Sequence, residues 1–418
     1  MKKSFLIVFF ISQFAISTSI ADYAGWTNIG AALPKSKGTV NLTALDIVGD
    51  SIWICSGLGN SFNQLPGEIY FSSDRGKSFS TQSTKYGTYC IKMLNSKLGY
   101  AAGMEGQVYK TTNGGEEWLR FGSASNTLTA MDFAPGSDTG YVGGMSGVLK
   151  KITPGGLVSV ASATSNDIRA ISCPSRNHAF ILWWSDIFFY DGYNPCEELQ
   201  ISVETNKPTS LIDLFMFNDT LGWVTGAYGL VAITKTGGWS LNEESGYYEQ
   251  KTDLTKDLYS IKFIDVNRGV ACGYGGNIIT SSNGGKTWTK EAEGLVSEML
   301  LAAHFFSNSD ILVVGNSKEN STPSVLMKVN ATLVENNDFN NEFSIYPNPA
   351  TDYIEISQPS ENSKLSEGLQ IKIYDVFGES LISVAQTSSS VQKIDVSALP
   401  AGIYFVRVGE IIQKFIKL

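Results

Sequence analysis

Short segments in which apolar and polar residues alternate recur along the chain at intervals of about 40 residues. Alternation with a period of two predicts β-strands that bury one face. Further strand-like runs and glycine-rich turns follow each segment, which favours a repeat architecture with several strands in every unit. The seven segments are Leu42–Val48, Cys90–Leu94, Leu128–Phe133, Ile168–Cys173, Leu211–Phe217, Leu258–Ile264 and Leu300–Phe306.

A second pattern follows these strands and repeats with them. In its clearest copies Leu98–Gly103 precedes Gln107–Trp118, and Arg268–Gly273 precedes Asn277–Trp288. Small residues in the first part permit close approach near a central axis, and glycines in the second part mark a turn. A period of about 40 residues with several strands per unit is typical of a β-propeller, here of about seven blades. Weaker copies occupy Asp50–Phe79, Thr139–Gly156 and Leu221–Trp239.

The last repeat unit, from about Leu300 to Asn330, lacks the Gly-Gly-x-x-Trp turn of the clearest copies. Near the start of the chain, Gly25-Trp26-Thr27-Asn28 resembles the segment that follows this turn elsewhere. We therefore predict that residues near Trp26 form the outer strand of the last blade, which would close the ring and hide its free edges. The propeller is expected to span residues 22–330.

The chain changes character after Asn330. Residues 331–342 are polar and rich in asparagine, which indicates a linker. Residues 343–418 then contain short strand-like runs separated by turns, which predict a small immunoglobulin-like β-sandwich. The predicted fold class is therefore all-β, with a propeller followed by a sandwich. The strand-like runs are Tyr353–Ile356, Leu369–Tyr374, Ser380–Val384, Val391–Val396, Gly402–Val408 and Ile411–Ile416.

The N-terminus has the pattern of a secretion signal. Two lysines precede an apolar run, Phe5–Ile16, which ends in the small-x-small sequence Ser19-Ile20-Ala21. This pattern predicts a signal peptide, residues 1–21, with cleavage between Ala21 and Asp22. The alternative is a membrane anchor, but a spanning helix needs about 20 apolar residues. No later run in the sequence is long and apolar enough to span a bilayer, so no transmembrane segment is predicted in the mature chain.

Composition and charge argue against several classes of partner. The chain has 43% hydrophobic and 17% charged residues, as folded proteins do. Its net charge of −9, with cations scattered singly, argues against nucleic acid and anionic membrane surfaces. Five cysteines without CxxC spacing and two histidines supply no metal-ligand pattern, and no cofactor is predicted. Cys173 and Cys196 could meet across neighbouring strands, but burial as small core residues fits better.

The C-terminal segment carries a set of motifs in a fixed order up to the last residues. It resembles the type A sorting domain of the type IX secretion system of Bacteroidetes. The resemblance implies periplasmic entry through the signal peptide, recognition by the secretion machinery and a secreted or cell-surface location. An ordinary accessory β-sandwich is the alternative. The matching segments are Ile345–Ala350 (with Tyr346, Pro347, Asn348 and Pro349), Lys372–Gly378, Ile394–Arg407 (with Gly402 and Tyr404) and Lys414–Leu418 (with Lys414 and Lys417).

The turns of the repeat resemble Asp boxes. In such a box the Asp or Asn side chain accepts hydrogen bonds from turn N–H groups, glycine tolerates positive φ, and an aromatic ring enters the core. We therefore expect the box residues to be structural and predict no catalytic residue among them. One box is complete, with Ser72, Asp74, Gly76 and Phe79, and two have Asn in place of Asp, with Asn113, Gly115 and Trp118, and with Asn283, Gly285 and Trp288.

Among families with Asp boxes, the form Asn-Gly-Gly-x-x-Trp preceded by Gly-Tyr-x-x-Gly resembles photosystem II stability/assembly-factor-like propellers. This resemblance covers most of residues 40–320 and implies the propeller fold and a binding role. It carries no photosystem function to a secreted protein of this kind. Function must instead be argued from a site, because a fold alone does not define it.

A sialidase-like or other glycan-active hydrolase is the alternative function. Sialidases share the propeller and the box, but need three arginines that grip a carboxylate, a Tyr nucleophile with a Glu partner and an acid/base Asp. Two of the five propeller arginines, Arg75 and Arg120, are expected at the outer rim. Another carboxylate pair stays open, because pair geometry is invisible in sequence. The remaining arginines are Arg169, Arg176 and Arg268, and the histidines, expected in loops or core, are His178 and His304.

Trp183 and Trp184 are the candidate aromatic residues for ligand contact, as a platform for sugar or peptide. Alternation along a strand sends the two rings to opposite faces, so at least one is expected in the core. The sequence is thus interpreted as a secreted or cell-surface, non-catalytic propeller that binds a protein or glycan ligand.

Overall fold

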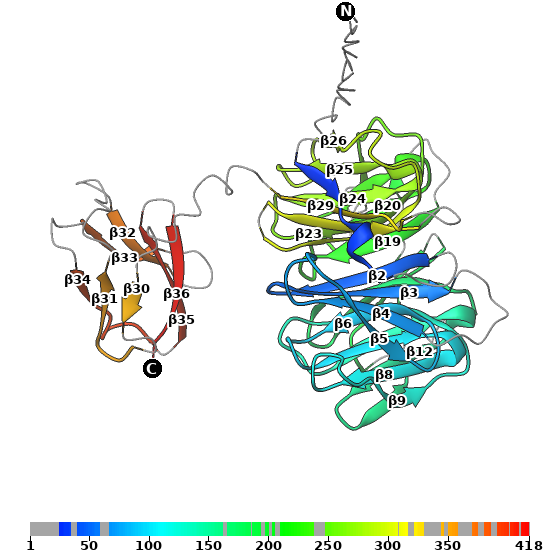
Figure 1. The fold of residues 1–418 in the computed structure, drawn as a ribbon, viewed down its shortest axis with the longest axis horizontal. Coiled ribbons are helices and arrows are strands. Elements are labelled where there is room, and N and C mark those ends of the chain that lie inside the picture. Colours follow the sequence, from blue (N-terminus) through cyan, green and yellow to red (C-terminus); the bar gives the residue numbers. More distant parts are fainter. Residues whose placement is uncertain are drawn as a thin grey trace, which may run out of the picture. The chain divides into compact units, whose positions relative to one another are not determined.

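The computed structural model of the chain divides into two compact units, residues 1–330 and 331–418 (Figure 1). The predicted signal peptide with its cleavage site, the linker 331–342, Cys196 and residues 347–349 lie outside the described residues. The described residues are 25–34, 40–58, 67–161, 165–184, 186–193, 197–199, 203–204, 210–237, 247–307, 309–316, 322–329, 344–346, 350–357, 370–374, 380–385, 391–400, 402–408 and 411–417.

The described part of the first unit contains seven sheets, each a blade of a β-propeller whose successive strands pair antiparallel. The all-β prediction is therefore confirmed, with seven blades. Blades 1 to 3 are β2 (Val40–Val48), β3 (Ser51–Leu58), β4 (Gly67–Ser72) and β5 (Ser80–Thr84); β6 (Thr88–Met93), β7 (Gly99–Gly103), β8 (Gln107–Thr111) and β9 (Leu119–Ser123); and β10 (Leu128–Phe133), β11 (Gly140–Gly144), β12 (Leu149–Thr153) and β13 (Gly156–Ser159).

Blades 4 to 6 continue the same order from the inner to the outer strand. Blade 5 also carries β18 (Val203–Glu204), which pairs in parallel with β22. The strands are β14 (Ile168–Ser175), β15 (His178–Trp183), β16 (Asp186–Tyr190) and β17 (Glu197–Leu199); β19 (Leu211–Met216), β20 (Gly222–Gly226), β21 (Val231–Thr234) and β22 (Tyr247–Gln250); and β23 (Leu258–Phe263), β24 (Gly269–Gly273), β25 (Ile278–Ser281) and β26 (Thr289–Glu291).

Blade 7 closes the ring with strands from both ends of the unit. It consists of β27 (Leu300–Phe305), β28 (Ile311–Gly315), β29 (Val325–Lys328) and β1 (Trp26–Asn28). The outer strand β1 pairs antiparallel with β29 and lies in dark blue beside the late strands in Figure 1. The prediction that residues near Trp26 complete the last blade is confirmed. This pairing covers a sheet edge that β29 would otherwise expose.

Glycine ends five of the seven second strands, β7, β11, β20, β24 and β28, and allows each to approach the chain that precedes the inner strand. A Cβ added at Gly144 would lie 2.0 Å from the carbonyl oxygen of Thr127, and one at Gly273 would lie 2.1 Å from that of Asp257. No side chain fits at such distances, so glycine is required at these two positions. The small residues in the repeat therefore permit close approach near the axis, as the sequence pattern indicated.

The second unit contains two sheets in its described part, in the order β30-β31-β34 and β33-β32-β35-β36. A core of apolar residues, including Ile354, Ile373, Val406 and Phe415, is fully or almost fully buried. Alternating burial along these strands accounts for the sheet-rich fold predicted from the sequence. The strands are β30 (Ser344–Tyr346), β31 (Tyr353–Ser357), β32 (Gln370–Tyr374), β33 (Ser380–Ala385), β34 (Val391–Asp395), β35 (Gly402–Val408) and β36 (Ile411–Lys417).

Candidate ligand-binding site

The inner strands of the seven blades line an axial channel with a volume of about 570 Å³. Each inner strand has a bulge or register irregularity near its start, after the first residue in six strands and after Leu42 in β2, and the residue at the irregularity lines the channel. We call the ring formed by these seven residues the channel mouth. Its members are Thr43, Tyr89, Thr129, Arg169, Ile212, Tyr259 and Leu301.

Three members of the channel mouth tie their own blade to the next one. The Thr43 hydroxyl donates to the Thr88 carbonyl at 3.3 Å, and the Thr129 hydroxyl donates to the Ile168 carbonyl at 2.7 Å. Arg169 makes the equivalent bond from Nη1 to the carbonyl of Leu211 at 2.7 Å. In each case the acceptor belongs to the first residue of the next inner strand, so these bonds hold neighbouring blades in register.

Deeper in the channel, side chains of one inner strand accept backbone N–H groups of the next. Asp46 accepts from Met93 at 2.6 Å, Asp132 from Cys173 at 2.8 Å, and Asp213 from Ile261 at 2.9 Å. Ser172 and Ser260 perform the same role with hydroxyl oxygens. The three channel carboxylates are therefore engaged in holding blades together, and none is left as a free acid or base.

Charged side chains connect blades 7, 1, 2 and 3 at this deeper level. Nε2 of His304 lies 3.3 Å from Asp46 Oδ1, and Lys92 Nζ lies 3.2 Å from Asp132 Oδ1. His304 Nδ1 also lies 2.8 Å from the Phe305 carbonyl oxygen. Because a carbonyl and a carboxylate only accept hydrogen bonds, the imidazolium form makes both contacts together.

The ionisation of Asp46 and Lys92 follows from this network. Burial opposes the charge on Asp46, but the charge of Lys92 and the hydrogen bond from His304 outweigh it and lower the pKa of the carboxyl. The carboxylate of Asp132 raises the pKa of Lys92 against the effect of its burial. Both groups are therefore charged over the physiological pH range, as paired buried ions are expected to be.

Around the channel mouth, the turns between the second and third strands of four consecutive blades expose large side chains. They are Met145 of blade 3, Trp184 of blade 4, Tyr228 of blade 5 and Tyr274 of blade 6, and we call them the exposed arc. Backbone bonds tie the turns to the start of the inner strands, for example from Met145 N to the Thr127 carbonyl at 2.9 Å. The arc thus lies at the end of the propeller where the channel mouth opens.

Two members of the arc occupy strained backbone. Trp184 has φ of 47° and Tyr228 has φ of 57°, in the left-handed region that bulky residues rarely adopt. The corresponding turns of blades 3 and 6 place Ser146 and Gly275 in this conformation. Trp184 and Tyr228 are nevertheless 62% and 51% exposed, so core packing does not explain the rings. Strain of this kind is characteristic of functional positions.

Cations lie against two rings of the arc. The guanidinium of Arg169 lies 4.8 Å from the centre of the Trp184 ring, and Lys256 Nζ lies 5.7 Å from that of Tyr274.

Burial raises the pKa of Tyr89, and burial together with Asp257 and Tyr274 raises that of Tyr259. These hydroxyls of the channel mouth therefore remain protonated and able to donate hydrogen bonds.

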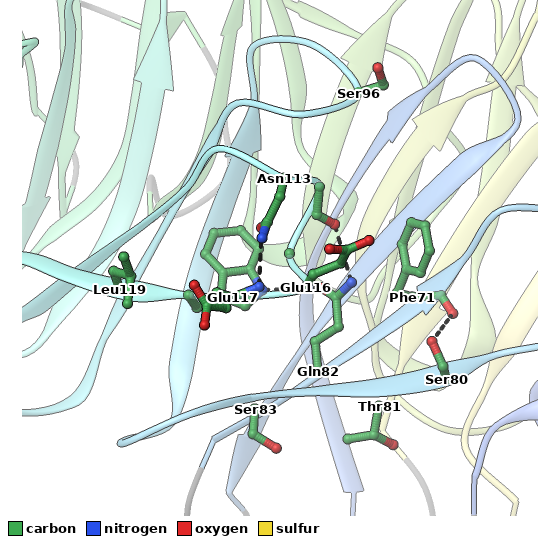
Figure 2. A pocket seen from close by; sticks show the side chains of 13 residues that line it. Phe71, Ser80, Thr81, Gln82, Ser83, Ser96, Asn113, Glu116, Glu117 and Leu119 are labelled. Atoms are coloured by element: carbon green, nitrogen blue, oxygen red, sulfur yellow. Dashed lines mark hydrogen bonds between the residues drawn. The ribbon is translucent and has the colours of Figure 1, made fainter.

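A larger groove, of about 800 Å³, lies at the rim between β5 and the box turn of blade 2 (Figure 2). Gln82 reaches from β5 towards this turn and binds it: Nε2 donates to the Gly114 carbonyl at 3.1 Å, and Oε1 accepts from Trp118 Nε1 at 3.0 Å. The polar groups at its floor thus bond to one another across the blades. The groove follows from how a box turn docks on the preceding blade.

The predicted box residues lie in turns with the expected bonds. Asp74 accepts from the N–H and the hydroxyl of Ser78, and Ser72 Oγ accepts from the N–H of Gly76. Asn113 accepts from Glu117 N, and Asn283 accepts from Thr287 N. Gly76, Gly115 and Gly285 have positive φ, and Phe79, Trp118 and Trp288 pack on the blade cores.

The structure separates the two candidate tryptophans. Trp183 is buried, stacked on Phe188 at 3.3 Å, whereas Trp184 is exposed on the arc. The expectation that at least one of the two rings lies in the core is confirmed. The sequence pattern pointed to Arg169 only as one of the arginines that a sialidase would need. Its place in the channel mouth could have been read from its alignment with Thr129, since each is the second residue of its inner strand.

Other predicted residues have structural surroundings. His178 in β15 pairs with Asp219 at 3.0 Å, and Arg75 of the first box turn pairs with Asp310 at 2.7 Å. In the second unit, Tyr404 is buried with its hydroxyl bonded to the Pro400 carbonyl. Tyr346 lies in β30, Gly402 in β35 and both Lys414 and Lys417 in β36.

The described cysteines are not reactive nucleophiles. Cys55, Cys90, Cys173 and Cys272 are buried and free. Burial raises the pKa of Cys55 to about 12 and raises the pKa of the other three thiols as well. The described residues hold no group of three or more metal-ligating side chains. Nor does any helix in the described part of the chain have the length and apolar character needed to cross a membrane.

Comparison with known proteins identifies the class of the second unit. Residues 344–417 match the family model described as the secretion system C-terminal sorting domain. The chain is thus a β-propeller protein that is sorted by the type IX secretion system to the cell surface or the extracellular space. No curated protein matches the chain.

Solved structures resemble the propeller. One is YCF48 from Cyanidioschyzon merolae, with a TM-score of 0.55 and 16% identity, covering 74% of this chain and 99% of that one. YCF48 bound to D1 peptide has a TM-score of 0.54 and 13% identity, and the match covers 74% of this chain and 98% of that one. PorZ, a bacterial surface component of the type IX secretion system of Porphyromonas gingivalis, has a TM-score of 0.54 and 11% identity. The match covers 90% of this chain and 59% of PorZ. These likenesses support the fold alone.

Proposed function

We propose that this chain is a non-catalytic binding module that holds a protein ligand, through an exposed peptide segment, at the channel mouth and the exposed arc. The observation that carries the proposal is the pair Trp184 and Tyr228, large apolar rings that are exposed on strained turns where blades 2, 3 and 6 have Glu105, Ser146 and Gly275. Side chains that cost folding energy and add no core packing are best explained by contact with a ligand.

The chemistry of this face favours a protein ligand over a glycan. Tyr, Trp, Met and Arg are the residues most enriched at protein interfaces, and the arc with Arg169 contains all four. Trp, Tyr and Arg also dominate binding energy where a few residues carry most of it. A peptide ligand has a precedent in the fold, since one of the similar structures is described as bound to D1 peptide.

A glycan-active hydrolase has less support from the channel. Hydrolysis of a glycoside requires two carboxyl groups facing the scissile bond with unequal protonation. The channel carboxylates Asp46, Asp132 and Asp213 instead accept backbone N–H groups from neighbouring blades. The arginines that could grip a carboxylate are also dispersed, because Arg75 pairs with Asp310 in a box turn and Arg268 pairs with Asp265 in another turn.

The test compares peptide binding by the full chain and by a variant of the arc. The variant W184S/Y228S uses the residue that blade 3 has in the same conformation, Ser146, so that the turns keep their geometry. The variant L119S/V158S is the matched control, since it removes apolar side chains that are 64% and 52% exposed on outer strands.

We expect the wild-type chain to bind a subset of an array of random heptapeptides and the arc variant to lose at least tenfold in affinity, as for a central aromatic anchor. The control variant should bind like the wild type. Equal binding by the arc variant, or turnover of a polysaccharide that one carboxylate substitution abolishes, would overturn the proposal.

A further inference from the structure

Arg169 differs from the other members of the channel mouth in its charge. The equivalent residues of the other six blades are Thr, Tyr, Thr, Ile, Tyr and Leu, all uncharged. Seven equivalent positions in one ring provide an internal comparison, because the backbone around them is repeated. The comparison shows what each position needs for folding and what Arg169 has beyond that need.

Folding needs only a short donor at this position. Thr129 satisfies the first carbonyl of the next inner strand with its hydroxyl, as Arg169 does with Nη1. Arg169 Nη1 also lies 3.2 Å from the Ser210 hydroxyl. Among the described residues, neither Nη2 nor Nε of Arg169 has a hydrogen-bond partner. A guanidinium has five N–H donors, so the described residues leave most of its donor capacity unused.

The unused donors are held in a fixed orientation at the mouth. Arg169 is half-buried, its Nη1 is fixed by the Leu211 carbonyl, and its guanidinium lies against the Trp184 ring of the exposed arc. Leu211 N in turn donates to the Trp184 carbonyl at 3.1 Å, which fixes the position of the ring's own backbone. A preorganised guanidinium loses little entropy on binding and offers a planar fork.

We propose that Arg169 is the specificity-determining residue of this face and binds a carboxylate group of the peptide ligand. The inference rests on the proposed function and names the chemical group that the site selects. The carboxylate is that of an Asp or Glu side chain or of the C-terminus, since both present the same two oxygens to the fork.

Charge matching favours a carboxylate over a phosphate. Arg169 is the one charged residue in the ring, and a single positive charge matches a carboxylate better than a phosphate dianion. The two channel lysines, Lys92 and Lys262, each lie three residues further along their strands than Tyr89 and Tyr259 of the channel mouth, which places them about 10 Å deeper. Neither lysine can share an anion with Arg169.

The acidic groups near the mouth are engaged and leave the fork accessible. Asp167 accepts from Ser146 N at 2.8 Å, and Asp257 accepts from Tyr228 N at 3.0 Å. Asp213 accepts from Leu214 N and Ile261 N. Tyr89 and Tyr259 add neutral hydroxyl donors to the ring, and the side chains of Ile212 and Leu301 offer apolar contact to the residues beside the carboxylate.

The experiment uses the full chain and an array of random heptapeptides, each printed with a free and with an amidated C-terminus. Affinities of the best peptides are then measured for the wild type, Arg169→Thr and Arg169→Lys. Arg169→Thr keeps the bond to the next blade, as Thr129 makes it, and removes the fork. Arg176→Thr is the control, because it changes the net charge equally at a side chain that is 76% exposed in the same blade.

We expect the selected peptides to share Asp, Glu or a free C-terminus, and amidation or an Asp→Asn or Glu→Gln exchange to weaken binding about tenfold or more. Arg169→Thr should lose affinity by the same factor and keep the thermal midpoint of the wild type. It should also bind a peptide with a carboxylate and its amide counterpart equally. The affinity of Arg169→Lys should lie between those of the wild type and Arg169→Thr. Arg176→Thr should behave as the wild type.

The outcomes separate the inference from the proposed function. Peptide binding that ignores carboxylates, prefers phosphorylated peptides or survives Arg169→Thr would overturn the role of Arg169 and leave the binding face in place. Failure of the wild-type chain to bind any peptide of the array would overturn both.

Discussion

The indole Nε1 of Trp26 donates a hydrogen bond to Glu291 Oε2 at 3.0 Å, across 265 positions of the sequence. Trp26 belongs to the first strand of the propeller, and Glu291 belongs to the outer strand of blade 6. The same carboxylate accepts from Lys328 Nζ and Thr280 Oγ1, each at 2.8 Å. Partial burial opposes ionisation of Glu291, but these donors outweigh it and lower its pKa. One carboxylate thus joins blade 6 to both outer strands of blade 7.

Replacing Trp26 should destabilise the whole propeller, because blade 7 closes the ring. Trp26 is 4% exposed, and Trp26→Ala is expected to lower the free energy of unfolding by about 3–5 kcal/mol. The measurement is the free energy of unfolding of the propeller, obtained by urea unfolding of the full chain. Trp184→Ala is the matched control and should change stability by less than about 0.5 kcal/mol. Deletion of residues 22–30 should lower the melting temperature further, and an unchanged value would contradict this closure.

The complete box should make stability depend on pH through Asp74. The hydroxyl and the N–H of Ser78, and then the Ser72 hydroxyl, lower the pKa of Asp74 to about 2, below its ordinary value near 4. A lowered pKa contributes stability above the unfolded value, which is lost as the pH falls from about 4 to 2. Asp74→Asn copies the natural residue of the other boxes, Asn113 and Asn283, and should remove this acid-dependent part.

Unfolding curves of the wild type and Asp74→Asn at several pH values from about 5 to 2 measure this difference. The two proteins should differ in how steeply stability falls over that interval. Asp50→Asn is a suitable control, because its carboxylate is 69% exposed and lies 3.8 Å from Arg75. Parallel curves for the wild type and Asp74→Asn would show that the box carboxylate does not set the acid response.

Two tryptophans of the second strands should contribute equally and independently to blade packing. Trp53 Nε1 donates to the Gly114 carbonyl at 2.9 Å, and Trp223 Nε1 donates to the Gly284 carbonyl at 3.1 Å, each in the box turn of the next blade. Both spacings are 61 residues. Each Trp→Phe exchange should cost about 1–3 kcal/mol from the lost bond and volume. The double variant should show the sum, since the sites share no partner; a large deviation would reveal coupling around the ring.

The sequence predicted the propeller well because its main determinants are local and repeated. Alternation identified the inner strands, glycine marked the close approaches, and the Gly25–Asn28 segment identified the closing strand, since each signal depends on a few neighbouring residues. The bond from Trp53 to Gly114 was not predictable in this way. It depends on the curvature that places one blade against the next, which no single repeat specifies.

The candidate site was only partly predictable. The sequence named Trp183 and Trp184 together and placed at least one ring in the core without deciding which, and the structure has Trp183 buried and Trp184 exposed. It did not single out Tyr228, nor Arg169, whose contacts with Trp184 and Leu211 arise only where blades 4 and 5 adjoin the channel. The bulge in each inner strand also shifts the alternation by one residue, so the side chains that line the mouth do not follow the simple pattern.

Asp46 should be the most sensitive residue of the channel. It is buried, accepts from Ile47 N and Met93 N, and contacts His304 across the seam between blades 7 and 1. Asp46→Ala leaves these donors unsatisfied and is expected to cost about 3–5 kcal/mol. Asp46→Asn keeps one acceptor and should cost less. Because its pKa is lowered in the folded state, the ionised group stabilises the protein above pH about 4, and this contribution is lost as the pH falls below that value.

Urea unfolding at about pH 7 and about pH 3 separates the contribution of the ionised Asp46 carboxylate from that of its hydrogen bonds. The stability difference between the wild type and Asp46→Asn should be larger at the higher pH and shrink on acidification. His304→Gln tests the other side of the seam, since it removes the imidazole that hydrogen-bonds the carboxylate, and it should reduce the same pH dependence. If both variants matched the wild type at every pH, the charged contact between the first and last inner strands would not contribute to closure. If Asp46→Asn alone changed the acid response, Lys92 and the backbone donors would account for the ionised state without His304.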